Sequence, residues 1–201
     1  MKEIFEIKDK DIIYSLLDDA EYGTLAICKE NIPYSLPVNF IRIDNLIYFH
    51  GSKKGRKIET IKANPKASFS VTKELSLIQS YFSSNDNLAC PATQFFKSVI
   101  IDGQIEFVEK YDEKVLALQK LMEKLQPEGG YRALNDEVYK KIINATTIYK
   151  LIPNQIKAKF KLGQNLNKER FEMIVENLEK RGDELDKDTL SLMKYFRNNS
   201  I

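Results

Sequence analysis

The chain has 201 residues, of which 43% are hydrophobic, and its 31 lysines and arginines nearly balance its 29 aspartates and glutamates, giving a net charge of +2. This length suits one domain with a core of its own, and the balanced charge excludes a general attraction to nucleic acid. No apolar run approaches the roughly 20 residues of a membrane span. A single histidine excludes a multi-histidine metal site within one chain.

The two cysteines, Cys28 and Cys90, do not have the spacing of a metal or redox motif. Two free thiols and no recognisable signal peptide suit a reducing compartment. We therefore expect a cytoplasmic protein with no membrane partner and no nucleic-acid partner.

Apolar periodicity in the first part of the chain predicts one helix followed by short strands. The helix is predicted over 9–20, and the strands over 24–28, 34–43, 46–49 and 67–71. Pro37 interrupts the second strand, which fits an edge strand or one whose backbone faces a ligand. A short helix is predicted over 58–62, because Asn64-Pro65 must end it.

The second part of the chain begins with an irregular segment over 72–96, which either covers a pocket or is a disordered surface excursion. The later elements are predicted as a strand over 98–108 with a bulge at Gly103, helices over 111–125 and 131–144, strands over 146–153 and 156–162, and two helices after 167 that Gly182 separates. This order predicts a mainly β protein with helices (α+β), built as an antiparallel barrel.

A basic turn directly follows the aromatic strand at 46–49. His50 and Gly51 lead into the segment 53–57, in which four of five residues are cations. Glycines let backbone amides face a ligand, a helix start adds partial positive charge, and Arg56 can bind a phosphate with two hydrogen bonds. The turn therefore predicts an anion site, with a solvated basic loop as the alternative. Its spacing matches neither a Walker A loop nor a dinucleotide-binding fingerprint.

The segment YFHGSKKGRKIETIKANPKASFSV resembles the flavin-phosphate segment of the pyridoxamine 5'-phosphate oxidase-like split-barrel superfamily. There, an Arg-Lys pair after an aromatic strand precedes Asn-Pro by a fixed interval, as Arg56-Lys57 precedes Asn64-Pro65 here. The resemblance extends to PYSLPVNF at 33–40 and FKSVIIDGQIEFVEKYDEKVLALQKL at 96–121. The Nim (nitroimidazole-resistance) branch, which also has a histidine after the aromatic strand, is the most similar. The segment 158–183 is similar to the end of PaiB-like flavin-nucleotide-binding relatives.

The resemblance implies an FMN-binding split β-barrel over 1–163, with a helical extension over 164–201 packed on it, and a homodimer that shares its flavin sites. It implies that Arg56 and Lys57 hold the FMN phosphate with help from Lys54, and that the strand at 35–39 contacts the flavin ring. The residues expected to bind the cofactor are Ser35, Leu36, Pro37, Val38, Asn39, His50, Gly51, Lys54, Arg56, Lys57 and Ser98.

The resemblance implies an oxidoreductase in which the flavin carries the redox chemistry and NAD(P)H is a transient reductant. The electron acceptor would be a nitroaromatic or a similar small electrophile, and His50 would position or protonate it. A histidine that only anchors the turn is the alternative. The other functions considered are a flavin carrier or sensor without turnover and a PaiB-like transcriptional regulator. Oxidation of pyridoxamine phosphate itself is not expected, because the chain has no Arg-x-His motif near its end.

Overall fold

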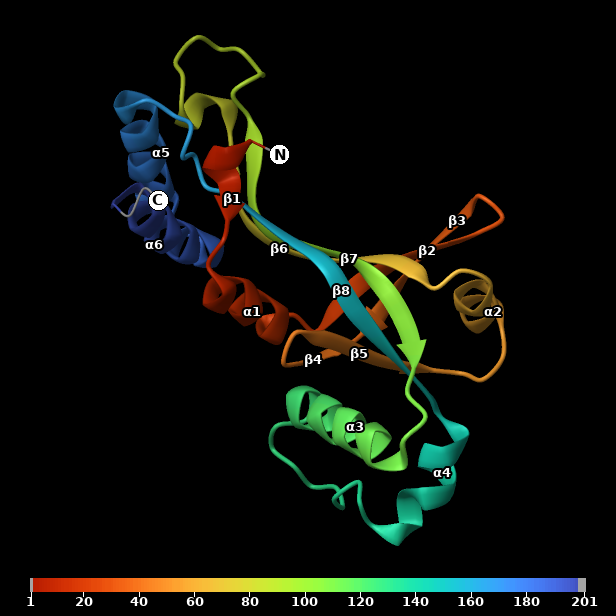
Figure 1. Ribbon diagram of the computed structural model, residues 1–201. Coiled ribbons are helices and arrows are strands. Elements are labelled where there is room, and N and C mark those ends of the chain that lie inside the picture. The colour runs from red at the N-terminus through yellow and green to blue at the C-terminus, as the bar shows by residue number, and fades with distance from the viewer. Residues whose placement is uncertain (1, 199–201) are drawn as a thin grey trace. The chain divides into compact units, whose positions relative to one another are not determined.

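The computed structural model describes residues 2–198, and its eight strands belong to one sheet (Figure 1). The strands are β1 Glu6–Ile7, β2 Tyr22–Lys29, β3 Ile32–Asn39, β4 Ile41–Ile43, β5 Leu46–Gly51, β6 Lys66–Ile78, β7 Thr93–Phe107 and β8 Thr147–Lys161. Their order is β3-β2-β6-β7-β8-β5-β4, and β1 pairs with β8 off this path. The assigned pairings are antiparallel. The predicted fold class, α+β with an antiparallel split barrel, is confirmed.

Helices make up most of the remaining described chain. The α-helices are α1 Lys10–Asp19, α2 Arg56–Ala63, α3 Tyr111–Leu125, α4 Lys140–Ala145, α5 Lys168–Arg181 and α6 Glu184–Asn198, and the 3-10 helices are η1 Glu3–Phe5, η2 Ser80–Phe82 and η3 Glu137–Tyr139. Within residues 2–198, no helix is long and apolar enough to cross a membrane.

The chain divides into two compact units. Unit 1 comprises Met1–Ile13, Thr72–Val99 and Lys157–Ile201, and unit 2 comprises Tyr14–Val71 and Ile100–Ile156. The long strands β6, β7 and β8 contribute residues to both units. The expected boundary at residue 164, between a barrel and a helical extension, stays a prediction.

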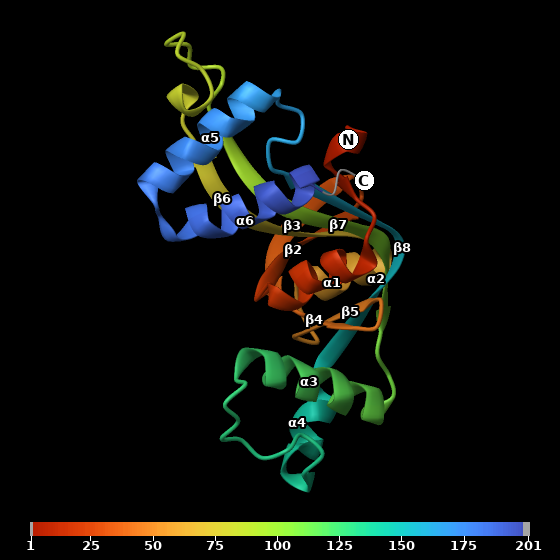
Figure 2. The same cartoon turned by 90° about the vertical axis from the view of Figure 1, so that its left-hand side faces the viewer.

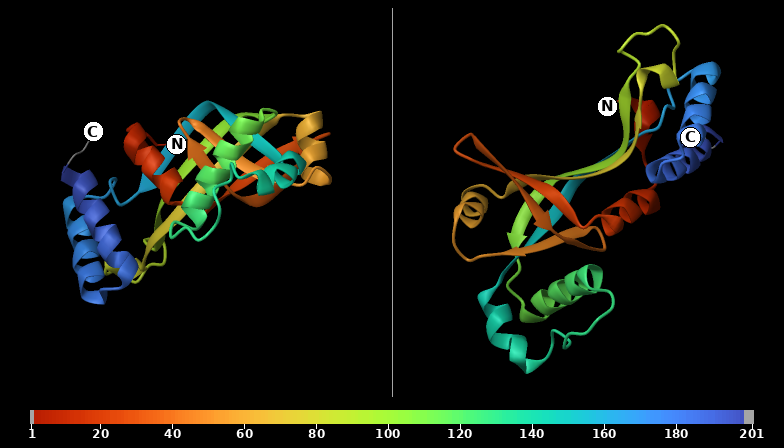
Figure 3. Two further views of the ribbon diagram at one scale, coloured as in Figure 1. Left: turned by 90° about the horizontal axis from the view of Figure 1, so that it is seen from below. Right: turned by 180° about the vertical axis from the view of Figure 1, so that it is seen from behind.

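Unit 2 contains the β2–β3 hairpin, whose tip uses Glu30 and Asn31 with φ angles of 52° and 61°. The hairpin is fully paired, from Tyr22 opposite Asn39 to Lys29 opposite Ile32. In the same unit α3 contacts both β4 and α4, as the view from behind shows (Figure 3). A cluster of buried side chains in this unit, against which Ile41 and Ile43 of β4 and Leu118 of α3 pack, consists of Tyr48, Val108, Ala117 and Ile148.

Gly103 in β7 is explained by a close approach of two strands in unit 2. A Cβ atom added at this position would lie 2.1 Å from the carbonyl oxygen of Ile152. Backbone cannot move away as easily as the end of a flexible side chain, so a larger residue here would separate β7 from β8. This contact accounts for the glycine, for which the sequence predicted a bulge.

Unit 1 carries the C-terminal helices α5 and α6, which lie side by side (Figure 2). Gly182 ends α5 in the left-handed conformation, with φ at 68°, so the predicted break between the two helices is confirmed. In α6, Asp186 is 0% exposed. Arg181 donates from Nε to Oδ2 of Asp186 at 2.8 Å, and Ser76 of β6 donates from Oγ to Oδ1 at 2.5 Å.

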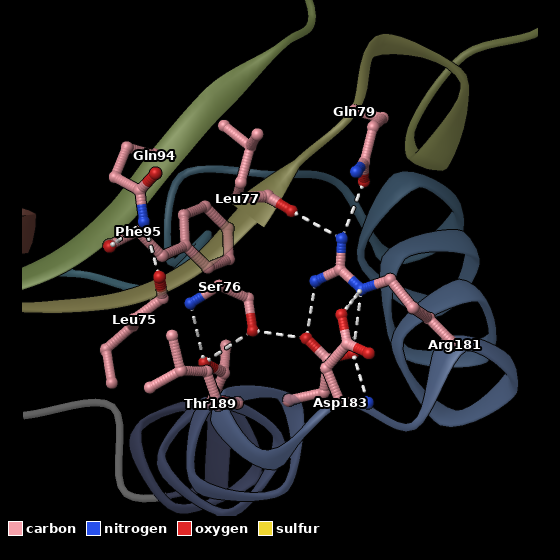
Figure 4. Close-up of polar contacts among 11 residues, drawn as sticks. Leu75, Ser76, Leu77, Gln79, Gln94, Phe95, Arg181, Asp183 and Thr189 are labelled. Carbon is pink, nitrogen blue, oxygen red and sulfur yellow. Dashed lines mark hydrogen bonds and ion pairs between the residues drawn. The ribbon is translucent and has the colours of Figure 1, made fainter.

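Arg181 and Ser76 make further hydrogen bonds to their neighbours (Figure 4). Arg181 donates from Nη1 to the Leu77 carbonyl at 3.0 Å and to Oε1 of Gln79 at 2.9 Å. The backbone amide of Ser76 donates to Oγ1 of Thr189 at 3.0 Å. These contacts join the loop between α5 and α6 to β6, so the two helices are tied to the strand by polar groups as well as by packing.

Four predicted elements differ from the structure. The segment 72–96 is not a single loop, because β6 continues to Ile78 and β7 begins at Thr93. The predicted strand 34–43 is two strands, because the chain changes partner from β2 to β5 at the buried Phe40. The two strands predicted over 146–162 are one continuous strand, β8.

The fourth difference is the helix predicted over 131–144, of which only η3 and α4 form. The Asp136 side chain accepts a hydrogen bond from the Val138 amide at 3.0 Å. The Leu134 amide donates to the Gln119 side chain at 2.9 Å. Such side-chain bonds compete with a helical backbone, so the helix begins only after this turn.

Candidate functional site

The basic turn joins β5 to α2 in unit 2. Gly55 precedes the first helical residue with a φ angle of 106°, which residues with a Cβ rarely adopt. The backbone amide of Lys54 donates to Oγ of Ser52 at 3.1 Å. The turn therefore has a defined conformation that exposes Lys54 and Arg56 at the start of α2.

Lys57 points back beneath the turn instead of into solvent. Its Nζ donates to the His50 carbonyl at 3.1 Å and lies 5.1 Å from the ring centre of Tyr149. A Cβ atom on Gly51 would lie 2.3 Å from this Nζ, so the glycine makes room for the ammonium group. Partial burial lowers the pKa of Lys57.

Arg56 connects the start of α2 to β3. Its Cζ lies 4.2 Å from the ring centre of Tyr34, and its Nη2 donates to the Pro33 carbonyl at 3.3 Å. A guanidinium stacked on an aromatic ring loses little freedom and still presents N–H donors along its edge. This contact brings two predicted parts of the site together, the basic turn and the strand that includes 35–39.

The strand β3 ends the strand path of the sheet. Within residues 2–198, one edge of β3 therefore has no strand partner, and its backbone groups can face a ligand. Pro37 is tolerated in this edge strand. Val38 is buried, Leu36 is half-buried, and Ser35, Pro37 and Asn39 are exposed.

His50 lies at the end of β5, opposite Ile148 of β8. Although its side chain is exposed by surface area, the neighbouring protein displaces enough water to lower its pKa, and the charge of Lys57 lowers the pKa further. An imidazole with a pKa below 6.5 is neutral near pH 7, with one nitrogen as donor and the other as acceptor.

Ten of the eleven predicted residues lie in unit 2, and Ser98 lies in unit 1. Its Oγ donates to the Lys159 carbonyl at 3.4 Å. Sequence reasoning missed Tyr34 and Tyr149 as parts of the site. Tyr34 directly precedes the predicted binding residues 35–39, and this position in the chain was the available signal. Tyr149 had no local signal.

No group of three histidine, cysteine, aspartate or glutamate side chains within 2–198 is arranged to hold a metal ion. The site described above instead offers cations and backbone groups, which suit an anionic organic cofactor.

An antiparallel sheet with this strand order, an aromatic strand and a basic turn before a short helix defines a split-barrel protein. The chain belongs to the pyridoxamine 5'-phosphate oxidase family, whose model matches residues 9–160. Among curated proteins, none matches the chain.

Solved structures share the fold at low sequence identity. A protein from Bacteroides thetaiotaomicron, provisionally assigned to 5-nitroimidazole antibiotic resistance, is 22% identical with a TM-score of 0.63 and covers 77% of this chain and 85% of its own. The flavocytochrome Anf3 from Azotobacter vinelandii is 22% identical with a TM-score of 0.65, over 78% of this chain and 69% of its own. The FAD and heme binding protein from Mycobacterium smegmatis is 20% identical with a TM-score of 0.62. The match covers 78% of this chain and 73% of that protein.

Proposed function

We propose that this protein binds FMN, with the phosphate at the start of α2 and the flavin ring along β3, and acts as an oxidoreductase on small electrophiles. The observation that carries the proposal is the contact of Arg56 with Tyr34 and Pro33. This contact joins the start of α2 to an open strand edge through an arginine, whose guanidinium is suited to a phosphate. Family membership and the flavin-binding and FAD-binding proteins among the similar folds support it.

The residues present fit an anionic flavin nucleotide. Lys54 and Arg56 are exposed cations at a helix start, where backbone amides and the helix dipole also favour a phosphate. Lys57 lies deeper, and its ammonium group, with three N–H donors of which one serves the His50 carbonyl, holds the turn and adds positive charge. Ser98 stays a proposed contact.

Bound flavin would supply the two-electron redox chemistry. The chain's own part is to orient the ring with the backbone of 35–39 and to hold a neutral imidazole, His50, near the ring. A neutral imidazole can donate a hydrogen bond to an acceptor, and its minor imidazolium form can transfer a proton and then recover one from water. NADH or NADPH is the proposed transient reductant, and a nitroaromatic or a similar electrophile is the proposed acceptor, in keeping with the resistance assignment of a similar fold.

The proposed assembly is a two-fold homodimer that shares its flavin sites. Tyr22 and Ile32, at the two ends of the paired β2–β3 hairpin, are 63% and 60% exposed. Large apolar side chains beside a strand with a free edge favour burial by a second subunit.

The visible absorption spectrum of the purified protein, followed by titration with FMN, tests this function. Flavin bands after purification, or saturable FMN binding, are the expected results. Turnover is then tested by reoxidation of NAD(P)H-reduced flavin with a nitroaromatic acceptor. Binding without turnover would favour the carrier or sensor function, and no flavin binding at all would overturn the proposal.

A further inference from the structure

Unit 2 contains a cavity of about 340 Å³ that none of the proposed flavin-binding residues lines. Its walls come from the basic turn, from α2, from the end of β7, from the start of α3 and from the residues that begin β8. Buried Ile58 and Val108 lie at its apolar side, with exposed fractions of 7% and 3%. A cavity of this size holds a group such as a phosphate or a pyrophosphate.

The charged lining of this cavity is mostly positive. Lys53, Lys62 and Lys114 line it from three separate segments, and Glu109 is the one carboxylate among its lining residues. Three cations that converge from different parts of the chain repel one another, and an anion bound between them relieves this repulsion. The cavity therefore has the charge that a phosphate group requires.

Two of the three lysines are held in place by backbone carbonyls. Nζ of Lys53 donates to the Asn144 carbonyl at 2.9 Å, and Nζ of Lys114 donates to the Thr146 carbonyl at 3.4 Å. Carbonyls at the end of α4 attract cations, which explains these two lysines without a ligand. However, an ammonium group has three N–H donors, so one such bond leaves donors that can face the cavity.

Lys62 is not explained in this way. Its side chain makes no hydrogen bond or ion pair with the described residues 2–198, yet it lines the same cavity from α2, one turn after Ile58. We infer that Lys53, Lys62 and Lys114 bind the phosphate group of a small molecule in this cavity. The ligand has a dianionic phosphate, either free as phosphate or pyrophosphate, or carried by a nucleotide such as NADPH.

The two sources differ in a way that an experiment can separate. NADPH carries a 2'-phosphate that NADH lacks. A cavity that binds this phosphate therefore binds NADPH more tightly than NADH. A cavity that takes free phosphate binds pyrophosphate and does not distinguish NADPH from NADH. Binding of NADPH in this cavity rests on the proposed oxidoreductase function, whereas binding of free phosphate or pyrophosphate does not.

Isothermal titration calorimetry of the full chain, saturated with FMN where FMN binds, tests the inference with pyrophosphate, NADPH and NADH as probes. Lys62→Gln should weaken pyrophosphate or NADPH roughly tenfold, as expected for the loss of a charge-assisted hydrogen bond. The double variant Lys53→Gln with Lys62→Gln should weaken it further, and added salt should do the same. Lys141→Gln, which removes an exposed lysine of α4 that does not line the cavity, is the matched control.

The flavin site is tested in parallel so that the two proposals can fail separately. Lys62→Gln should leave the affinity for FMN unchanged, and Arg56→Gln should leave the affinity for pyrophosphate unchanged. If none of the probes binds, or if Lys62→Gln and Lys141→Gln have equal effects, the phosphate site is wrong. It is also wrong if Lys62→Gln weakens FMN as much as it weakens pyrophosphate.

Discussion

The guanidinium of Arg56 lies 4.2 Å from the ring centre of Tyr34. This contact joins the first residue of α2 to the edge strand β3. The same guanidinium reaches the Pro33 carbonyl, 23 residues away along the chain. Arg56 therefore links the proposed phosphate subsite to the strand that is proposed to orient the ring, and a change at Arg56 should weaken the cofactor through its phosphate.

The pKa of His50 is the first quantity to measure. Partial desolvation and then the charge of Lys57 lower this pKa from its usual value of 6.5. As the protein has one histidine, a single imidazole resonance followed by NMR against pH reports it directly. Lys57→Gln should raise the pKa of His50, whereas Lys54→Gln should leave it nearly unchanged. A pKa above 6.5 in the parent protein would contradict the arrangement of His50 and Lys57.

The proposed role of His50 in turnover is tested by His50→Gln. Glutamine keeps a hydrogen-bond donor and an acceptor but does not exchange a proton near neutral pH. The affinity for FMN should survive, while reduction of a nitroaromatic or a quinone should fall by roughly 10²- to 10⁴-fold. Steady-state rates under NADH or NADPH measure this. If the variant turns over acceptors as fast as the parent, His50 is an anchor of the turn.

The buried carboxylate of Asp186 should dominate the stability of unit 1. Asp186→Ala leaves the Arg181 guanidinium and the Ser76 hydroxyl without their shared acceptor, which typically costs about 3–5 kcal/mol. Asp183 also pairs with Arg181, at 3.2 Å, but its side chain is 66% exposed, so Asp183→Ala should cost about 0–1 kcal/mol. Urea unfolding compares the two variants, and equal costs would contradict the buried network.

The same carboxylate predicts how stability depends on pH. The hydrogen bond from Arg181 is the largest effect that holds the pKa of Asp186 below its usual value of 3.8. Because the folded-state pKa is the lower one, the unfolded chain takes up the proton first as the pH falls. The stabilisation is therefore present above about pH 4 and is lost in more acidic solution. Asp186→Asn should remove this part of the pH dependence of the unfolding free energy. An unchanged slope of that free energy against pH below about pH 4 would contradict the prediction.

Sequence reasoning could predict the elements with a clear apolar pattern, such as α3 and β5. It missed the continuation of β6 because Thr72, Lys73 and Glu74 are three exposed polar residues in succession, which hides the alternation. It divided β8 at Pro153. β5 pairs with β8 only up to Leu151, and β1 only from Ala158, so the missing N–H of this proline removes none of these hydrogen bonds.

The candidate site was predicted as a set of residues but not as a set of contacts. The order Arg56-Lys57 gives no sign that one side chain reaches β3 while the other turns beneath its own loop. These directions depend on Tyr34 and Tyr149, which lie far from the turn in sequence. Such long-range packing cannot be read from local periodicity.

The proposed homodimer predicts a sedimentation coefficient of two subunits at micromolar concentration. Tyr22→Ser with Ile32→Ser removes two exposed apolar side chains and should shift the equilibrium toward the monomer. Lys66→Gln, at another exposed position, is the control. A monomer with full flavin occupancy would contradict a shared site.

The dissociation constants of FMN and riboflavin for Arg56→Gln, compared with those of the parent and of Lys66→Gln, test the central claim most directly. The two ligands share the ring and differ in the phosphate, which gains charge-assisted hydrogen bonds of about 1.5–3 kcal/mol each. We predict that Arg56→Gln weakens FMN at least roughly tenfold and leaves riboflavin nearly unchanged. An equal loss for both ligands, or no loss for either, would contradict a flavin phosphate held at the start of α2.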